Sequence, residues 1–206
     1  MAKLIDLSYM ISDNMPVHPY DDRVKLYQDR DLKKDGYNNF KLEIGMHAGT
    51  HIDSPMHLID RSTFVSEIGL DRFIGRGVLL DVRGQKTIPY RPGYEERVLE
   101  DDIVILYTGY SSKYGTDEYY KDHPVIAEDF MDFLIERKIK MLGMDLPSPD
   151  PYPFKIHKGL LSKDILIIEN LTNLSSLLDK KSFTILALPL KIRAEASLAR
   201  VVALVD

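Results

Sequence analysis

The sequence predicts a mixed α/β fold in one domain that spans residues 1–206. Two observations predict this class. Short apolar runs bounded by glycine or acidic residues recur along the chain, and one segment repeats apolar residues at helical spacing. A length of 206 residues suits one domain with a substantial core and leaves too little chain for two.

Nine segments have the alternation or the apolar density of β-strands. The runs that follow residues 76 and 102 are rich in β-branched residues, as expected of central strands with both faces buried. The predicted strands are Leu4–Ser8, Val24–Gln28, Phe40–Gly45, Gly77–Val82, Ile103–Tyr107, Met141–Asp145, Ile165–Glu169, Thr184–Leu188 and Arg200–Val205.

One clear helix is predicted over residues 126–137, where residues such as Phe130 and Leu134 form an apolar stripe opposite acidic positions. Shorter helical segments are predicted over His157–Ser162 and Leu174–Leu178. The proline-rich segment Leu146–Pro153 can continue neither a helix nor a central strand, so we expect a shaped loop there.

Composition excludes several classes of protein. The net charge of −5 is spread without the basic stripe that binds nucleic acid, and no apolar run approaches the ~20 residues of a membrane span. An acidic residue, Asp6, interrupts the N-terminus before a signal peptide can form. With no cysteine, the chain suits a reducing compartment. We therefore expect a cytoplasmic protein that binds neither nucleic acid nor membrane.

The most informative feature is a segment of eleven positions that holds three of the six histidines and an aspartate. His47, Gly49, His51 and Asp53 are separated by steps of two, so on an extended strand they share one face, with room between the two rings. Imidazole nitrogens and a carboxylate oxygen are ligands that zinc and related metals prefer. The segment predicts a metal site at the end of a strand, in preference to a metal-free cluster of hydrogen-bonded residues.

Three other side chains are open to more than one interpretation. His57 follows a proline and is a further ligand, a partner of a ligand, an acid/base or an ordinary surface histidine. Glu169 ends an apolar run, where a buried carboxylate is costly unless it is paired or coordinated. His157 lies twelve residues earlier and within reach of it. From the residues alone, an ordinary structural role is favoured for His157, and an ordinary and a functional role are equally compatible with Glu169.

The segment from His47 to His57 resembles the H-x-G-T-H-x-D-x-P-x-H hallmark of the cyclase-like metal hydrolases, the family that contains bacterial kynurenine formamidase and isatin hydrolase. The resemblance extends over nearly the whole chain. It includes Ile5–Ser8, Tyr107–Tyr110, Gly143–Ser148, His157–Asn170 and Leu188–Lys191.

The resemblance implies a swivelling β/β/α fold with a mixed central sheet that holds one or two divalent metal ions, zinc first and manganese as the alternative. It implies that His47, His51 and Asp53 bind one metal. Asp53 and Glu169 then bridge to a second metal, which His157 also binds. His57 becomes the proton donor and acceptor.

The chain departs from the family pattern in two loops. Kynurenine formamidases carry a tryptophan in the N-terminal loop, whereas this chain has none and places His18 and Tyr20 on either side of Pro19. We expect His18 and Tyr20 to contact the substrate. The usual Gly-x-Asp-Gly loop near the C-terminus is replaced by the segment 194–197, so both loops are expected to shape a different pocket.

These features predict a metal-dependent amidohydrolase of the arylformamidase type, acting on the C–N bond of a small formamide or cyclic amide. The alternatives are an isatin hydrolase-like, lactone or ester hydrolase, a lyase or dehydratase acting on a hydroxy acid, and a protein that binds a metal or metabolite without turnover. The family resemblance further implies a homodimer or homotetramer in which the loop 15–22 acts across an interface.

Overall fold

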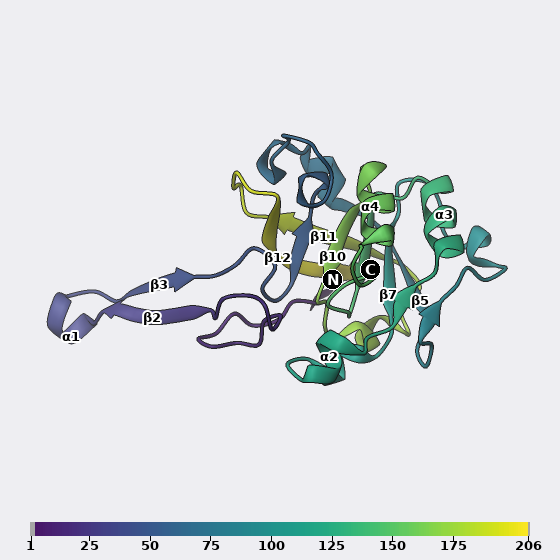
Figure 1. Cartoon of the computed structure of the whole chain (residues 1–206). Helices are drawn as coiled ribbons and strands as arrows, with labels where there is room; N and C mark the ends of the chain where they lie inside the picture. The colour runs from purple at the N-terminus through teal and green to yellow at the C-terminus, as the bar shows by residue number, and fades with distance from the viewer. Residues whose placement is uncertain (1–2, 206) are drawn as a thin grey trace.

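A closed barrel of seven strands forms the centre of the molecule in the computed structural model, which describes residues 3–205 (Figure 1). Around the ring the strands follow the order β12, β11, β5, β7, β9, β10 and β4, and β4 pairs again with β12 to close it. β1 adds to the ring by pairing with β12. The strands are β1 Lys3–Asp6, β4 His51–Asp53, β5 Ile74–Asp81, β7 Ile103–Tyr107, β9 Met141–Met144, β10 Leu166–Glu169, β11 Phe183–Pro189 and β12 Ala196–Val205.

Parallel and antiparallel pairings share the ring. β5, β7, β9 and β10 run parallel to one another, while β4, β11 and β12 join them by antiparallel pairings. The chain is therefore a mixed α/β single domain, as predicted, but the expected central sheet is a closed barrel. Its description as a swivelling β/β/α fold stays a prediction.

The barrel strands β4, β9 and β10 are buried at every residue, and β7 is buried at all but its last. Alternate residues along β7 separate into two apolar clusters: Ile103 and Ile105 belong to one, and Val104 and Leu106 to the other. The cluster that contains Val104 and Leu106 also contains the apolar residues of the helices, so it lies between the barrel and the helical layer. The cluster that contains Ile103 and Ile105 therefore fills the barrel interior, as in other small barrels whose interior is packed with side chains.

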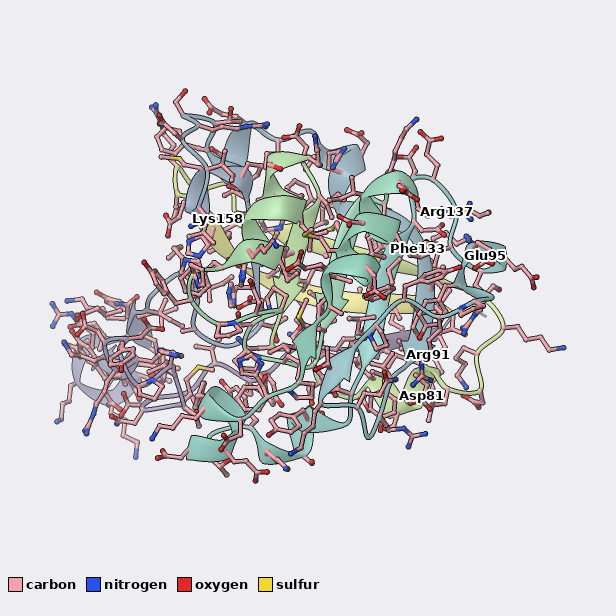
Figure 2. All side chains as sticks on the ribbon, turned by 45° about the vertical axis from the view of Figure 1, so that its right-hand side comes forward. Asp81, Arg91, Glu95, Phe133, Arg137 and Lys158 are labelled. Atoms are coloured by element: carbon pink, nitrogen blue, oxygen red, sulfur yellow. The ribbon has the colours of Figure 1, made fainter. Side chains whose placement is uncertain are left out.

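Two helices cover one outer side of the barrel (Figure 1). α3 (Glu128–Glu136) confirms the helix predicted from its apolar stripe, and α4 (Lys155–Ser162) confirms the shorter prediction. Figure 2 shows Phe133 of α3 beside Arg137, the residue that follows this helix, and the guanidinium carbon lies 5.5 Å from the ring centroid. Lys158 faces solvent on α4, whereas its neighbour His157 is buried.

The remaining elements are short. They comprise the helices α1 Leu32–Asp35 and α2 Asp117–Lys121, the strand pair β6 Thr87–Ile88 and β8 Val125–Ile126, and the 3₁₀ turns η1 Pro55–His57, η2 Val65–Glu67, η3 Leu70–Phe73, η4 Tyr94–Glu96, η5 Tyr110–Lys113 and η6 Leu174–Leu177. The last of these confirms the helical turn predicted there. Among residues 3–205, every helix falls short of the length and apolarity needed to cross a membrane.

A two-stranded hairpin projects from the barrel as an arm (Figure 1). It consists of β2 (Lys25–Arg30) and β3 (Asn39–Glu43), which pair with each other and with no other described strand. Every residue of β3 is exposed. The arm confirms the two strands predicted in this region, but it ends before the histidine segment and does not run directly into it.

Gly143 tests the packing of the barrel interior. A β-carbon on Gly143 would lie 2.7 Å from Ile105 Cδ1 and 3.0 Å from Leu171 Cδ1, and both neighbours are completely buried. We expect Gly143→Ala to lower the free energy of unfolding by about 1–3 kcal/mol through overpacking, as measured by urea denaturation. Gly45→Ala, where a β-carbon meets open space, is the control and should change it by less than about 0.5 kcal/mol. Equal stabilities of the two variants would contradict this packing.

Candidate metal centre

The histidine segment is a tight turn followed by a very short strand. Residues 46–50 form turns and bends, Gly49 has a φ of +62°, and only His51–Asp53 is extended. The prediction that all four positions lie on one strand face is therefore wrong for His47 and Gly49, which precede the strand. The positive φ at Gly49, which glycine adopts without steric cost, instead lets the chain turn back so that His47 approaches Asp53.

Hydrogen bonds from the end of β10 hold this turn. The Asn170 side-chain amide donates to the Gly49 carbonyl at 3.0 Å, and the Thr50 hydroxyl donates to the Asn170 carbonyl at 2.6 Å. Both interactions are buried, so the turn is tied to the residue that directly follows Glu169. The two halves of the candidate site are thereby joined although they lie over a hundred residues apart.

The second half of the site depends on Asp150. Its carboxylate accepts hydrogen bonds from the backbone N–H groups of Ile156 (2.7 Å) and His157 (3.2 Å) in the first turn of α4. It also accepts from His157 Nδ1 at 2.8 Å. One side chain therefore satisfies the free N–H groups of the helix and sets the direction of the His157 ring.

The five predicted metal ligands come together around two buried carboxylates. His47 Nδ1 lies 3.0 Å from Asp53 Oδ1, and His157 Nε2 lies 3.0 Å from Glu169 Oε1. His51 Nε2 lies between the two carboxylates, 3.4 Å from Asp53 Oδ1 and 3.4 Å from Glu169 Oε2. Two overlapping groups of side chains could each hold an ion: His47, Asp53 and His57, and His51, Asp53 and Glu169.

The hydrogen bonds of His51 test whether these residues fit a metal. His51 Nδ1 lies 2.8 Å from the Gly49 carbonyl, which can only accept, so Nδ1 carries the proton and Nε2 of the neutral ring presents a lone pair. His51 Nε2 and Asp53 Oδ1 are both buried without a hydrogen-bond partner. Lone pairs that face one another in a buried space need a cation between them, so the donor set fits a divalent metal.

Electrostatics leads to the same conclusion. Burial alone lowers the pKa of His51, but Asp53 and Glu169 outweigh it and raise the pKa to about 10. Burial also opposes ionisation of Asp53, yet the surrounding histidines hold the pKa of its carboxyl well below the usual range. The ionised carboxylates therefore attract a positive charge, either protons on the imidazoles or a metal that displaces them.

His57 differs from the three histidines that contact the carboxylates, His47, His51 and His157. Its ring is 4.3 Å from the His47 ring, measured between centroids, and its nitrogens make no hydrogen bond with any residue described between 3 and 205. Burial lowers the pKa of His57. The structure thus places a neutral imidazole with free nitrogens beside the carboxylates, as a proton acceptor requires.

A cavity of about 260 Å³ opens onto these side chains. Aromatic rings and the N-terminal loop form much of its wall, and the residues outside the ligand set include Val17, His18, Asp21, Tyr114, Tyr120 and Phe154. His18 thus lines the cavity, as its predicted contact with substrate requires. Tyr20 is 94% exposed and lies outside this wall, so its contact with substrate stays a prediction.

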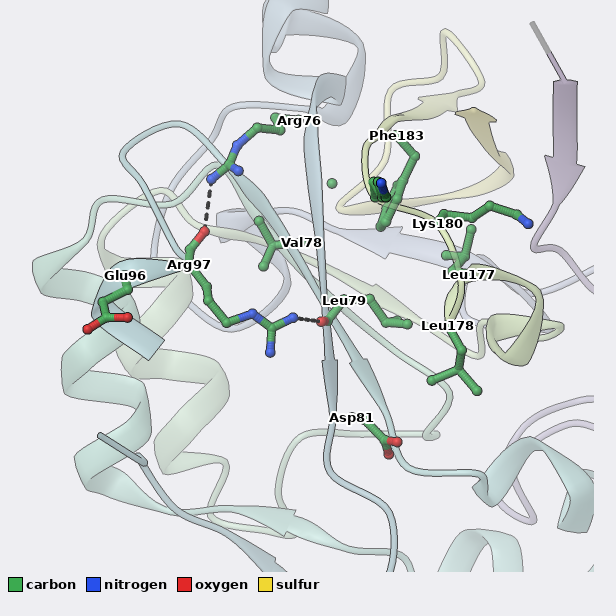
Figure 3. A pocket seen from close by; sticks show the side chains of 12 residues that line it. Arg76, Val78, Leu79, Asp81, Glu96, Arg97, Leu177, Leu178, Lys180 and Phe183 are labelled. Carbon is green, nitrogen blue, oxygen red and sulfur yellow. Dashed lines mark hydrogen bonds between the residues drawn. The ribbon is translucent and has the colours of Figure 1, made fainter. Parts of the chain in front are cut away.

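A second cavity, of about 350 Å³, lies between β5 and the segment around η6 (Figure 3). It contains no histidine, and its two arginines are engaged in structural contacts. Arg76 pairs with Asp102, Arg76 also donates to the Arg97 carbonyl, and Arg97 donates to the Leu79 carbonyl. The smaller cavity is therefore the candidate active site, because it alone of the two contains the buried acid and base groups.

Sequence reasoning missed two carboxylates of the site. Asp150, which orients His157, lies inside the proline-rich loop, and Glu195, whose Oε1 lies 3.2 Å from His47 Nε2, lies in the segment that departs from the family pattern. Neither position belongs to a periodic pattern or a motif. An acidic residue inside an otherwise turn-forming loop was the only available signal.

The residues and the fold define a class: a closed α/β barrel with a buried His/carboxylate centre at one end of its strands. Residues 5–151 match the model of the Cyclase family, described as "Putative cyclase". Because the match covers more than half of the chain, the chain belongs to the Cyclase family.

Individual relatives agree over nearly full lengths. The chain is 35% identical over 191 residues to an uncharacterized protein of Methanocaldococcus jannaschii, covering 92% of each chain. It is 26% identical over 211 residues to a kynurenine formamidase of Erythrobacter litoralis, covering 97% of this chain and 93% of the relative. Its fold matches a crystal structure of an isatin hydrolase bound to thioisatinate with a TM-score of 0.89 and 21% identity, covering 100% of this chain and 93% of the other.

Metal binding is testable through thermal stability. Zinc that binds only the folded state should raise the melting temperature, with a stabilisation of about 2.7 kcal/mol at a hundred times the dissociation constant. Differential scanning calorimetry should detect this increase in the wild type and lose it in Asp53→Asn. His123→Gln, which changes a histidine outside the cluster, should keep it. An unchanged zinc response in Asp53→Asn would contradict the site.

Proposed function

We propose that the protein is a metal-dependent hydrolase of the arylformamidase type, cleaving the C–N bond of a small formamide or cyclic amide. One observation carries the proposal: the buried lone pairs of His51 and Asp53 face one another, and the unbonded ring of His57 lies beside them at the same cavity. The similarity to a kynurenine formamidase over nearly the whole chain supports the same reaction class.

Each residue of the site has a task in this reaction. A divalent metal, when bound, polarises the substrate carbonyl and lowers the pKa of a water molecule from 15.7 to about 7. His47, His51, Asp53, His157 and Glu169 would hold it. The neutral His57 ring accepts a proton from the attacking water and returns it to the leaving nitrogen. The aromatic wall of the cavity excludes bulk water and packs against a flat substrate.

The number and kind of metal ions belong to the same proposal. The five ligands, three imidazoles and two carboxylates, have enough donor atoms for two ions that would share Asp53 and Glu169. The mixture of imidazole and carboxylate suits zinc, with manganese as the alternative. Elemental analysis of the purified protein by mass spectrometry decides the ratio of metal to protein.

Replacement of His57 tests the catalytic assignment. Although one of the two groups that could hold an ion includes His57, we propose that it moves protons and leaves metal binding to the other five side chains. We therefore expect His57→Ala to reduce kcat on a good substrate by about 10²–10⁴ while the metal content stays unchanged. The assay panel comprises N-formylkynurenine, isatin and simple aryl formamides. Hydrolysis should incorporate oxygen from ¹⁸O-labelled water into the released acid.

The control for this assay is His123→Gln, which should retain full activity. Undiminished turnover by His57→Ala would refute the role of His57. No turnover of any compound by the metal-loaded wild type would favour a binding protein, and products formed without ¹⁸O would favour a lyase.

We also propose that the protein is a homodimer, with a homotetramer as the alternative. Leu26, Phe40 and Leu42 share one face of the hairpin arm, and Phe40 and Leu42 are 60% and 48% exposed. A lone two-stranded hairpin is marginally stable in water, so a second chain packed on this face would stabilise it. The arm connects the cavity-lining loop to His47, so the same contact would steady the cavity wall.

Light scattering coupled to gel filtration tests the assembly. The wild type should have at least twice the mass of one chain, and the double variant Phe40→Ser with Leu42→Ser should shift to the mass of one chain, because it removes the apolar face of the arm. Tyr37→Ser, near the tip of the arm, is the control and should leave the mass unchanged. A wild type with the mass of one chain would refute the proposal.

A further inference from the structure

Each of the three ligand histidines has one ring nitrogen directed at the buried carboxylates and the other held by an outer acceptor. For His51 the outer acceptor is the Gly49 carbonyl, and for His157 it is the Asp150 carboxylate. For His47 it is the carboxylate of Glu195, whose Oε1 lies 3.2 Å from His47 Nε2. Glu195 belongs to neither group of side chains that could hold an ion.

The backbone holds Glu195 in register with the histidine segment. Its carbonyl accepts hydrogen bonds from the N–H (3.1 Å) and the hydroxyl (2.7 Å) of Ser54, the residue after Asp53. The next residue, Ala196, pairs with Asp53 across β12 and β4. The pairing that closes the barrel therefore delivers the Glu195 side chain to the outer edge of the His47 ring.

The contact decides which nitrogen of His47 faces inward. An ionised carboxylate only accepts hydrogen bonds, so the hydrogen lies on Nε2, and Nδ1 of the neutral ring presents its lone pair. That nitrogen lies 3.0 Å from Asp53 Oδ1, inside the candidate metal centre. His47 thus directs Nδ1 at the carboxylates, whereas His51 and His157 direct Nε2 at them.

We propose that Glu195 is a positioning residue for the metal centre: it holds the hydrogen of His47 on Nε2 and so keeps Nδ1 as the metal-binding atom. The inference rests on the metal site proposed above. His47 is the ligand with most need of such a partner, because its side chain is 29% exposed while those of His51 and His157 are 1% and 4% exposed. Burial restrains the His47 ring less than the rings of His51 and His157, and the Glu195 carboxylate restrains it further.

Zinc titration of the metal-free protein against a competing chelator tests the proposal. Loss of an outer hydrogen-bond partner of a metal-bound histidine typically weakens metal binding by about 10–100-fold, and we expect a loss of this size in Glu195→Ala. Glu195→Gln keeps an oxygen that accepts from Nε2 and should show a smaller loss. Arg193→Ala is the control in the same loop: its guanidinium packs over the Phe64 ring, and its zinc affinity should equal that of the wild type.

A second measurement distinguishes positioning from a general structural role. In the zinc-loaded wild type, the Nε2 proton of His47 should give an imidazole NMR signal that is protected from solvent exchange, and Glu195→Ala should lose this protection. Wild-type zinc affinity together with an unchanged Nε2 signal in Glu195→Ala would overturn the inference. Failure of the wild type to bind zinc at all would instead overturn the metal site itself.

Discussion

Two carboxylates buried at the end of the barrel impose the strongest constraint on this structure. Asp53 and Glu169 are 1% and 5% exposed, and each ionised group withdrawn from water costs several kcal/mol unless positive charge and hydrogen bonds compensate for it. Three imidazoles face the pair, and a cation fits between them. The acceptors around the rings follow from the same need, because they decide which nitrogen of each ring faces the carboxylates.

Closure of the barrel is what brings these groups together. β4 has only three residues, yet it pairs with β10 on one side and with β12 on the other. Through β10 it meets Glu169, and through β12 it meets the loop that carries Glu195. Because β4 pairs with both β10 and β12, a shift in its register would separate the ligands. The ring of strands and the site are therefore a single structural unit.

The cavity depends on a different part of the chain. Its wall combines the loop before the hairpin arm with Tyr114, which precedes the short helix α2, and Tyr120, which lies within α2. The wall is therefore assembled from segments that lie about a hundred residues apart. The side chains that carry the chemistry and the segments that shape the pocket therefore belong to different parts of the chain. The carboxylates and imidazoles come from the barrel and α4, while the shape of the pocket comes largely from loops, which tolerate change more readily than strands.

Local patterns along the chain predicted much of this structure. The stripe that contains Phe130 and Leu134 predicted α3, because helical periodicity is a property of neighbouring residues. β-branched runs predicted β7 and β10 for the same reason. The motif from His47 to His57 predicted the chemical character of the site, because ligand type and spacing are written in the sequence.

Tertiary structure decided how those elements meet. Closure of the sheet into a ring depends on pairings between β4 and strands more than a hundred residues away, which leave no local trace. The turn at Gly49, and not the alternation of a strand, brings His47 to Asp53. Glu195 and Asp150 reach the histidines only through folding. By itself the sequence determined which side chains could bind a metal; the fold determined which atoms of those side chains face one another.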